Sequence, residues 1–223
     1  PDGALFDETA AAYRRLRLRS ESIITSTVTS NAISSLKPYS RVSTWSTLAS
    51  STATSLPPSA DLSLAMRTLS TNISFLSRAL GIAPLRRIMR PLLHPIQNYI
   101  WSHVVMSNSF SAAGVAQLAS DVDHLCSVVD AALGQAGKPG DSARLLKKLN
   151  EGLLLLGLDA TRQDSSIASE SQEQKRQLGL WEVEKRLFKD NESAREVLTE
   201  LGIETLTEAE ARGVLERRVE VGT

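Results

Sequence analysis

The sequence predicts an all-α protein: an antiparallel bundle of long helices followed by a small helical tail. Apolar residues recur in steps of three and four through most of the chain, and Pro or Gly residues stand between many of these stripes. No segment shows the period-two alternation of a β-strand. We therefore expect five or six main helices between residues 4 and 157, packed antiparallel.

The first expected element is one amphipathic helix over residues 5–36, about 48 Å long at about 1.5 Å per residue. The segment contains neither Gly nor Pro. Lys37 precedes Pro38, which disfavours helical backbone at the residue before it, so the helix should end there. Residues 46–59 are small, polar and proline-containing, which is typical of a mobile loop.

The second helix carries a stripe with 4-3-4-3-4 spacing that ends at Leu80, and Gly81 is expected to cap its C-terminus. Pro84 fits the first turn of the third helix. Pro91 and Pro95 fall inside that helix, so a kink or a break is expected there.

Ser109 is the expected cap of a fourth helix, and Asp141 of a fifth that continues through residues 145–156 after a Gly-rich turn at 134–140. The stripes of the second, fourth and fifth helices predict buried side chains at Leu69, Ile73, Leu76, Leu118, Val122, Leu125, Leu149 and Leu153.

Three short helices are expected in the tail, over residues 178–188, 194–201 and 208–219. Ser193 with Glu196, and Thr207 with Glu210, each fit a capping box. The expected organisation is thus a helical bundle at 1–159, a polar linker at 160–172 and a short-helix tail at 173–223.

Charge is sorted along the chain although the formal net charge is zero. Residues 1–100 carry eleven basic and five acidic side chains, or +6, whereas residues 101–159 carry −2 and residues 160–223 carry −4. One cysteine, Cys126, excludes a disulfide scaffold and favours a reducing compartment. The chain starts at Pro1 without a signal peptide, so we expect a piece of a longer protein that faces the cytosol.

Enzymatic chemistry finds no support in the sequence. His94, His103 and His124 lack metal-ligand spacing, and His124 and Cys126, two residues apart on a helix, point to different faces. The sequence holds no nucleophile elbow, phosphate-binding loop or dinucleotide fingerprint. We expect no catalytic residue, no metal and no cofactor.

Residues 111–125 resemble the turn of a DNA-binding helix-turn-helix, but the candidate recognition helix carries Asp121, Asp123 and Asp130. No Lys or Arg lies between Arg90 and Lys138, so repulsion from phosphates argues against DNA.

The sequence has two basic clusters, Arg14, Arg15, Arg17 and Arg19 in the first helix and Arg86, Arg87 and Arg90 in the third. The candidate partner-binding residues among them are Arg14, Arg15, Arg86 and Arg87. Guanidinium groups pair with carboxylates and phosphates, so an acidic partner helix or an anionic membrane surface would fit them. The alternative is that both clusters are ordinary solvated helix faces.

Several stretches resemble the C-terminal region of the RINT/TIP family of vesicle-tethering subunits, and together they span nearly the whole chain. They are ALFDETAAAYRRLRLRSESIITSTVTSNAISSLKPYSRVSTW, SFLSRALGIAPLRRI, IQNYIWSHVVMSNSFSAAGVAQLASDVDHL and LLKKLNEGLLLLGL. The segment from LGLWEVEKRLF to ARGVLERRVE is similar to the extreme C-terminus of filamentous-fungal members.

The resemblance implies a helical-rod tether without cofactor or active site, at the endoplasmic reticulum membrane. Such a Dsl-complex subunit captures COPI vesicles in Golgi-to-ER retrograde transport. It implies protein partners, namely sister tether subunits and SNARE N-terminal domains, with no nucleic acid and at most indirect membrane association. It supplies no partner-binding residue for any position. A membrane-surface module, a helical enzyme and a DNA-binding domain stay open as alternatives.

Overall fold

The computed structural model describes residues 4–48, 56–138, 140–160 and 178–221. Helices make up the fold, as predicted, and the residues described contain no strand beyond one isolated bridge between Phe110 and Arg218. The helices are α1 (Ala4–Leu36), α2 (Ser63–Ala79), α3 (Ile82–Ile100), α4 (Ala112–Leu133), α5 (Asp141–Leu145), α6 (Lys147–Leu156), α7 (Leu180–Lys189), α8 (Asn191–Glu200) and α9 (Glu208–Leu215).

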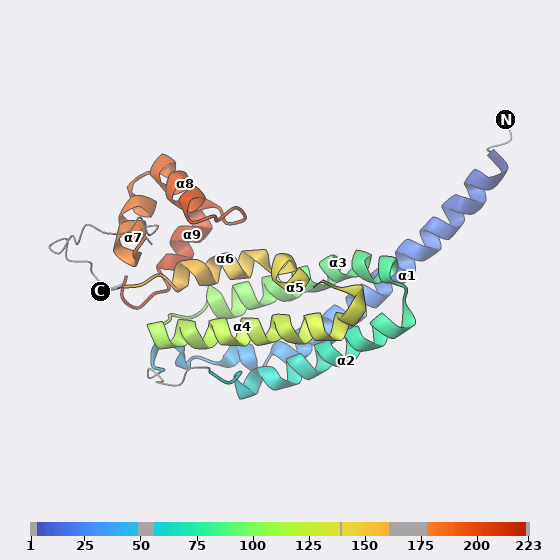
Figure 1. The fold of residues 1–223 in the computed structure, drawn as a ribbon, viewed down its shortest axis with the longest axis horizontal. Coiled ribbons are helices and arrows are strands. Elements are labelled where there is room, and N and C mark those ends of the chain that lie inside the picture. Colours follow the sequence, from blue (N-terminus) through green and yellow to red (C-terminus); the bar gives the residue numbers. More distant parts are fainter. Residues whose placement is uncertain (1–3, 49–55, 139, 161–177, 222–223) are drawn as a thin grey trace.

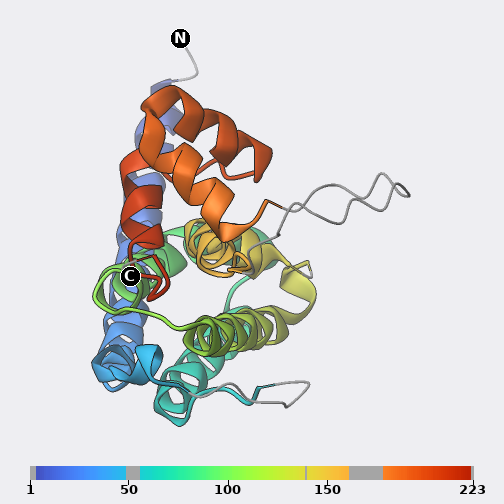
Figure 2. The same cartoon turned by 90° about the vertical axis from the view of Figure 1, so that its left-hand side faces the viewer.

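The long helices form an antiparallel bundle in which successive helices alternate in direction (Figure 1). Helix α2 packs against α1 and α4, and α1 also packs against α3. Helix α6 packs against α4 and contacts α9 of the tail. Helices α7, α8 and α9 contact one another and lie at one side of the bundle, as the end view shows (Figure 2).

One continuous core fills the bundle and extends into the tail. Of the eight side chains predicted to be buried, seven are: Leu69, Ile73, Leu76, Leu118, Val122, Leu125 and Leu149. Leu153 is the exception and is half-buried, because it lies at the edge of a cavity between α4 and α6, whereas Leu155 and Leu156 fill the core.

Helix α1 ends at Leu36, as Pro38 predicted. Of the kink or break expected in the third helix, the break is wrong, since α3 is a continuous helix across Pro91 and Pro95. Buried residues on both sides of the prolines, among them Ile88 and Ile96, hold it against its neighbours. The irregular turn comes later, as a π-helix at Trp101–Val105.

The predicted C-terminal cap of α2 and the predicted N-terminal cap of α4 are both wrong. Gly81 is not a left-handed C-cap; its φ of −68° makes it the extended residue that precedes α3. Ser111 caps α4, not Ser109: its hydroxyl accepts from the Gly114 amide. Phe110 instead pairs with Arg218 and is fully buried.

The predicted N-terminal caps of α5 and α8 are wrong as well. The Asp130 carboxylate accepts from the amides of Gly140 and Ser142 and thereby holds the start of α5, which Asp141 begins but does not cap. Asp190, not Ser193, caps α8.

The capping box of Thr207 and Glu210 at α9 is confirmed, with both arms present.

A buried carboxylate, Asp121 of α4, holds the end of the loop between α1 and α2. It accepts from Tyr39 Oη at 2.9 Å, from the Ser59 amide at 2.7 Å and from Ser59 Oγ at 2.6 Å. Gln117 Nε2 and Ser120 Oγ donate to the carbonyls of Pro57 and Leu56, respectively. Residues 56–59 are therefore pinned to α4, while 49–55, the centre of the expected mobile loop, lie outside the described residues.

A second buried carboxylate, Glu151 of α6, holds the tail on the bundle. It accepts from the amides of Glu204, Thr205 and Leu206 and from the Thr205 hydroxyl, immediately before α9. Lys148 adds a salt bridge to Glu210 and lies over the Trp101 ring, 4.7 Å from its centroid. The tail thus docks through specific polar contacts as well as the shared core. Of the expected linker at 160–172, all but Ala160 lies outside the described residues.

Candidate protein-interaction surface

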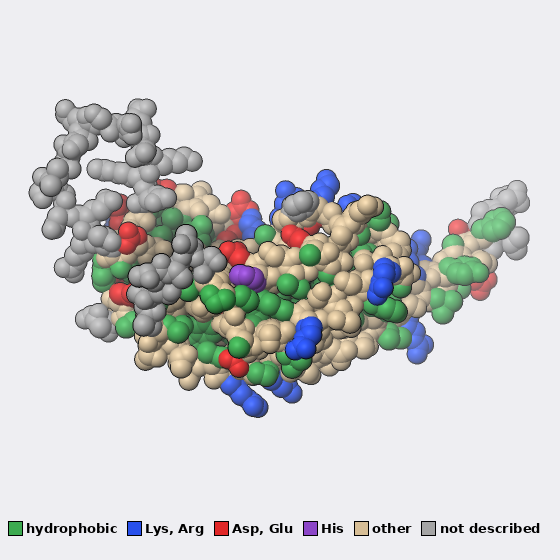
Figure 3. Space-filling model, turned by 60° about the horizontal axis from the view of Figure 1, so that its bottom comes forward, with side chains coloured by type: hydrophobic (Ala, Val, Ile, Leu, Met, Phe, Trp, Pro, Cys, Tyr) green, Lys and Arg blue, Asp and Glu red, His purple; other side chains and the backbone are tan. Residues whose placement is uncertain are grey.

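The N-terminal half of α1 projects beyond the bundle (Figure 1). None of its residues 6–20 is buried, whereas Val28, Ala32 and Leu36 in the other half belong to the core. Hydrophobic side chains are exposed along the projection (Figure 3), and five large ones are Phe6, Tyr13, Leu16, Leu18 and Ile23. The sequence predicts one amphipathic helix here but does not indicate that the apolar side chains in its first half are exposed.

Arg87 lies against α1 at the root of the projection. Its Nε and Nη2 donate to Oε1 of Glu21 at 3.0 and 2.9 Å, and Arg17 Nε lies 3.9 Å from the same oxygen. The Arg87 side chain is 44% exposed and that of Glu21 19%, so this partly solvated pair contributes about 0–1 kcal/mol to stability, but it links α3 to α1. Arg86 donates from Nε to the Ala136 carbonyl at 3.0 Å.

The structure therefore brings the two predicted basic clusters to the same end of the molecule. Arg14 and Arg15 lie about two turns before Glu21, where both are exposed and neither forms a salt bridge with a described residue. Arg86 and Arg87 are exposed too, yet each has an intramolecular acceptor. Of the four predicted residues, Arg14 and Arg15 are therefore solvated, whereas Arg86 and Arg87 make contacts within the chain.

The residues that could carry chemistry lie apart. His103 stacks on Tyr99, His94 lies near Asn98, and His124 Nδ1 donates to its own helix at the Ser120 carbonyl. No group of three metal-ligating side chains occurs in the part of the chain that the structure describes. Burial raises the pKa of the Cys126 thiol, and carboxylates including that of Asp130 add to the rise, which is opposite to what a reactive thiolate needs.

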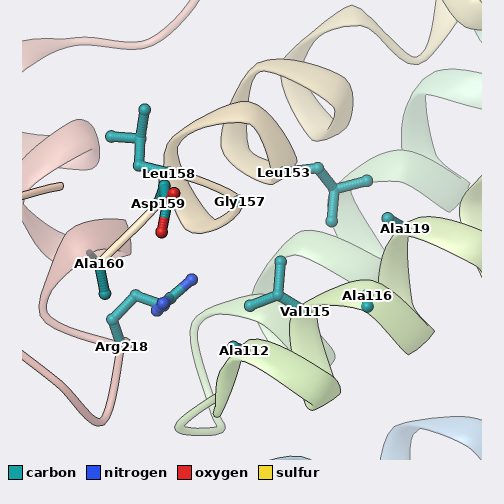
Figure 4. Close-up of a pocket in the computed structure, with 10 residues that line it drawn as sticks. All are labelled: Ala112, Val115, Ala116, Ala119, Leu153, Gly157, Leu158, Asp159, Ala160 and Arg218. Carbon is teal, nitrogen blue, oxygen red and sulfur yellow. The ribbon is translucent and has the colours of Figure 1, made fainter. Parts of the chain in front are cut away.

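A cavity of about 640 Å³ lies between the start of α4, the end of α6 and the C-terminal turn (Figure 4). Small apolar side chains, including Ala112 and Ala116, line most of it. Its one arginine, Arg218, is almost fully buried and donates to the Leu156 carbonyl and to Glu220. That guanidinium ties the C-terminal turn to α6 and serves the fold.

No helix in the described residues is long and apolar enough to cross a membrane. In comparisons with known proteins, no curated protein matches the chain significantly.

The structural comparison matches a chain in the crystal structure of the SNARE Sec20 bound to the Dsl1 complex subunit Tip20. The TM-score is 0.69 at 22% identity, over 95% of this chain and 34% of that chain. The present chain therefore spans about a third of the length of its structural neighbour, with which it shares the helical fold. The model of the RINT-1/TIP-1 family matches residues 1–218. Because that match covers almost the whole sequence, the chain belongs to the RINT-1/TIP-1 family.

Proposed function

We propose that this chain is a non-enzymatic interaction module of a vesicle-tethering subunit at the endoplasmic reticulum, acting in Golgi-to-ER retrograde transport. Its partners are SNARE N-terminal domains and sister tether subunits. The observation that carries the proposal is the family match over residues 1–218. The Sec20-bound Dsl1 complex subunit Tip20, which has the same helical fold, supports a SNARE as one partner.

The basic end of the bundle is the surface that we assign to binding. Arg14, Arg15, Arg86 and Arg87 lie at this end, in the part of the chain that carries +6, so an acidic helix would be steered toward it. Association through this end should weaken with salt, since the Debye length falls to about 8 Å at physiological ionic strength.

Capture of purified partners by the immobilised chain tests the proposal. The probes are N-terminal domains of endoplasmic reticulum SNAREs and the sister subunits of the complex, at low and at physiological salt. The variant Arg14→Glu/Arg15→Glu should weaken capture at low salt. Arg41→Glu/Arg67→Glu, an equal charge change at two exposed arginines elsewhere in the bundle, should leave capture intact.

The fourfold reversal that adds Arg86→Glu and Arg87→Glu should weaken capture further. Because those two side chains contact Ala136 and Glu21, circular dichroism must first show an unchanged helix content. Capture of neither SNAREs nor sister subunits by the wild-type chain would contradict the proposal. Flotation with anionic vesicles, dependent on the same arginines, would favour the membrane-surface alternative.

A further inference from the structure

We draw no further inference here: the strongest candidate, the cavity between the start of α4, the end of α6 and the C-terminal turn, is lined mostly by small apolar side chains, its buried Arg218 already donates within the chain, and nothing in the structure shows what covers it.

Discussion

Gly114 of α4 lies against the backbone carbonyl of Trp45, so closely that a Cβ at Gly114 would stand 1.9 Å from the Trp45 oxygen. The same oxygen accepts from the Ser111 amide and hydroxyl, both at 3.2 Å. The start of α4 therefore packs backbone to backbone on the segment that follows α1, and no side chain can move aside to make room.

Gly114→Ala should consequently destabilise the bundle by about 3 kcal/mol, at the upper end of the usual cost of overpacking. Urea unfolding followed by circular dichroism measures the change. Gly81→Ala is the control, because its nearest neighbour would be Pro84 at 3.8 Å, and it should change stability by less than about 1 kcal/mol. A Gly114→Ala midpoint equal to that of Gly81→Ala would show that the close approach is not real.

Tyr39 and Asp121 form a second critical contact. Burial, followed by the charge of Asp121 and its hydrogen bond, raises the pKa of Tyr39 well above its ordinary value, so the phenol stays protonated and donates to Asp121. Tyr39→Phe removes a donor from a buried carboxylate and should cost about 1–3 kcal/mol in urea unfolding. Tyr13→Phe, on the exposed projection, should cost nothing measurable. Equal midpoints for the two variants would contradict this role.

Glu151 should control how firmly the tail is held. A glutamine has one acceptor oxygen and adds an amide donor that faces the backbone amides of Glu204, Thr205 and Leu206. We expect Glu151→Gln to cost about 1–3 kcal/mol and to expose residues 178–221 to limited proteolysis. Cleavage at the wild-type rate would show that the Glu151 hydrogen bonds do not hold the tail on the bundle.

The same carboxylate predicts a pH dependence. Burial alone would raise the pKa of Glu151, but the hydrogen bonds from Thr205 and from three backbone amides outweigh burial and lower it. A lowered folded pKa means that the stabilisation is complete above the unfolded value of about 4.3 and is lost as pH falls through the folded value. The stability difference between wild type and Glu151→Gln should therefore shrink below about pH 4.3. A difference that stays constant into that range would contradict the assignment.

The sequence was sufficient to predict the helices because their signals are local. Pro38 sets the end of α1, stripes mark the core faces of α2 and α4, and the Thr207 capping box marks the start of α9. The capping residue was predicted less accurately where several candidates lie close together in sequence, as with Ser109 and Ser111. The competing hydroxyls differ only in which amide the fold brings within reach.

The polar contacts that hold the fold together could not be predicted, since they join residues far apart in sequence. Asp121 and Tyr39 are 82 residues apart, and Glu151 and Thr205 are 54 apart, so their spacing carries no signal. The exposed apolar face on the first half of α1 did leave a signal. Its stripe of Phe6, Tyr13 and Leu16 is out of phase with Val28 and Leu36, which a single buried face would not produce.

Hydrogen exchange of the free chain should divide α1 in two. Amides of residues 6–20 belong to a helical segment with no buried residue and should exchange far faster than those of residues 28–36, which the core protects. Mass spectrometry after short labelling times resolves the two segments. Uniform slow exchange along α1 at concentrations where the chain is monomeric would contradict an unpaired projection.

Exchange repeated with a saturating SNARE N-terminal domain or sister tether subunit tests the central claim most directly. If the basic end binds the partner, the complex should show new protection around Arg14 and Arg15 of α1 and around Arg86 and Arg87 of α3, with no comparable change at residues 178–221. This protection should be weakened in Arg14→Glu/Arg15→Glu and retained in Arg41→Glu/Arg67→Glu. Binding that protects the tail or the cavity between α4 and α6, while α1 and the start of α3 exchange as in the free chain, would contradict the proposed binding surface.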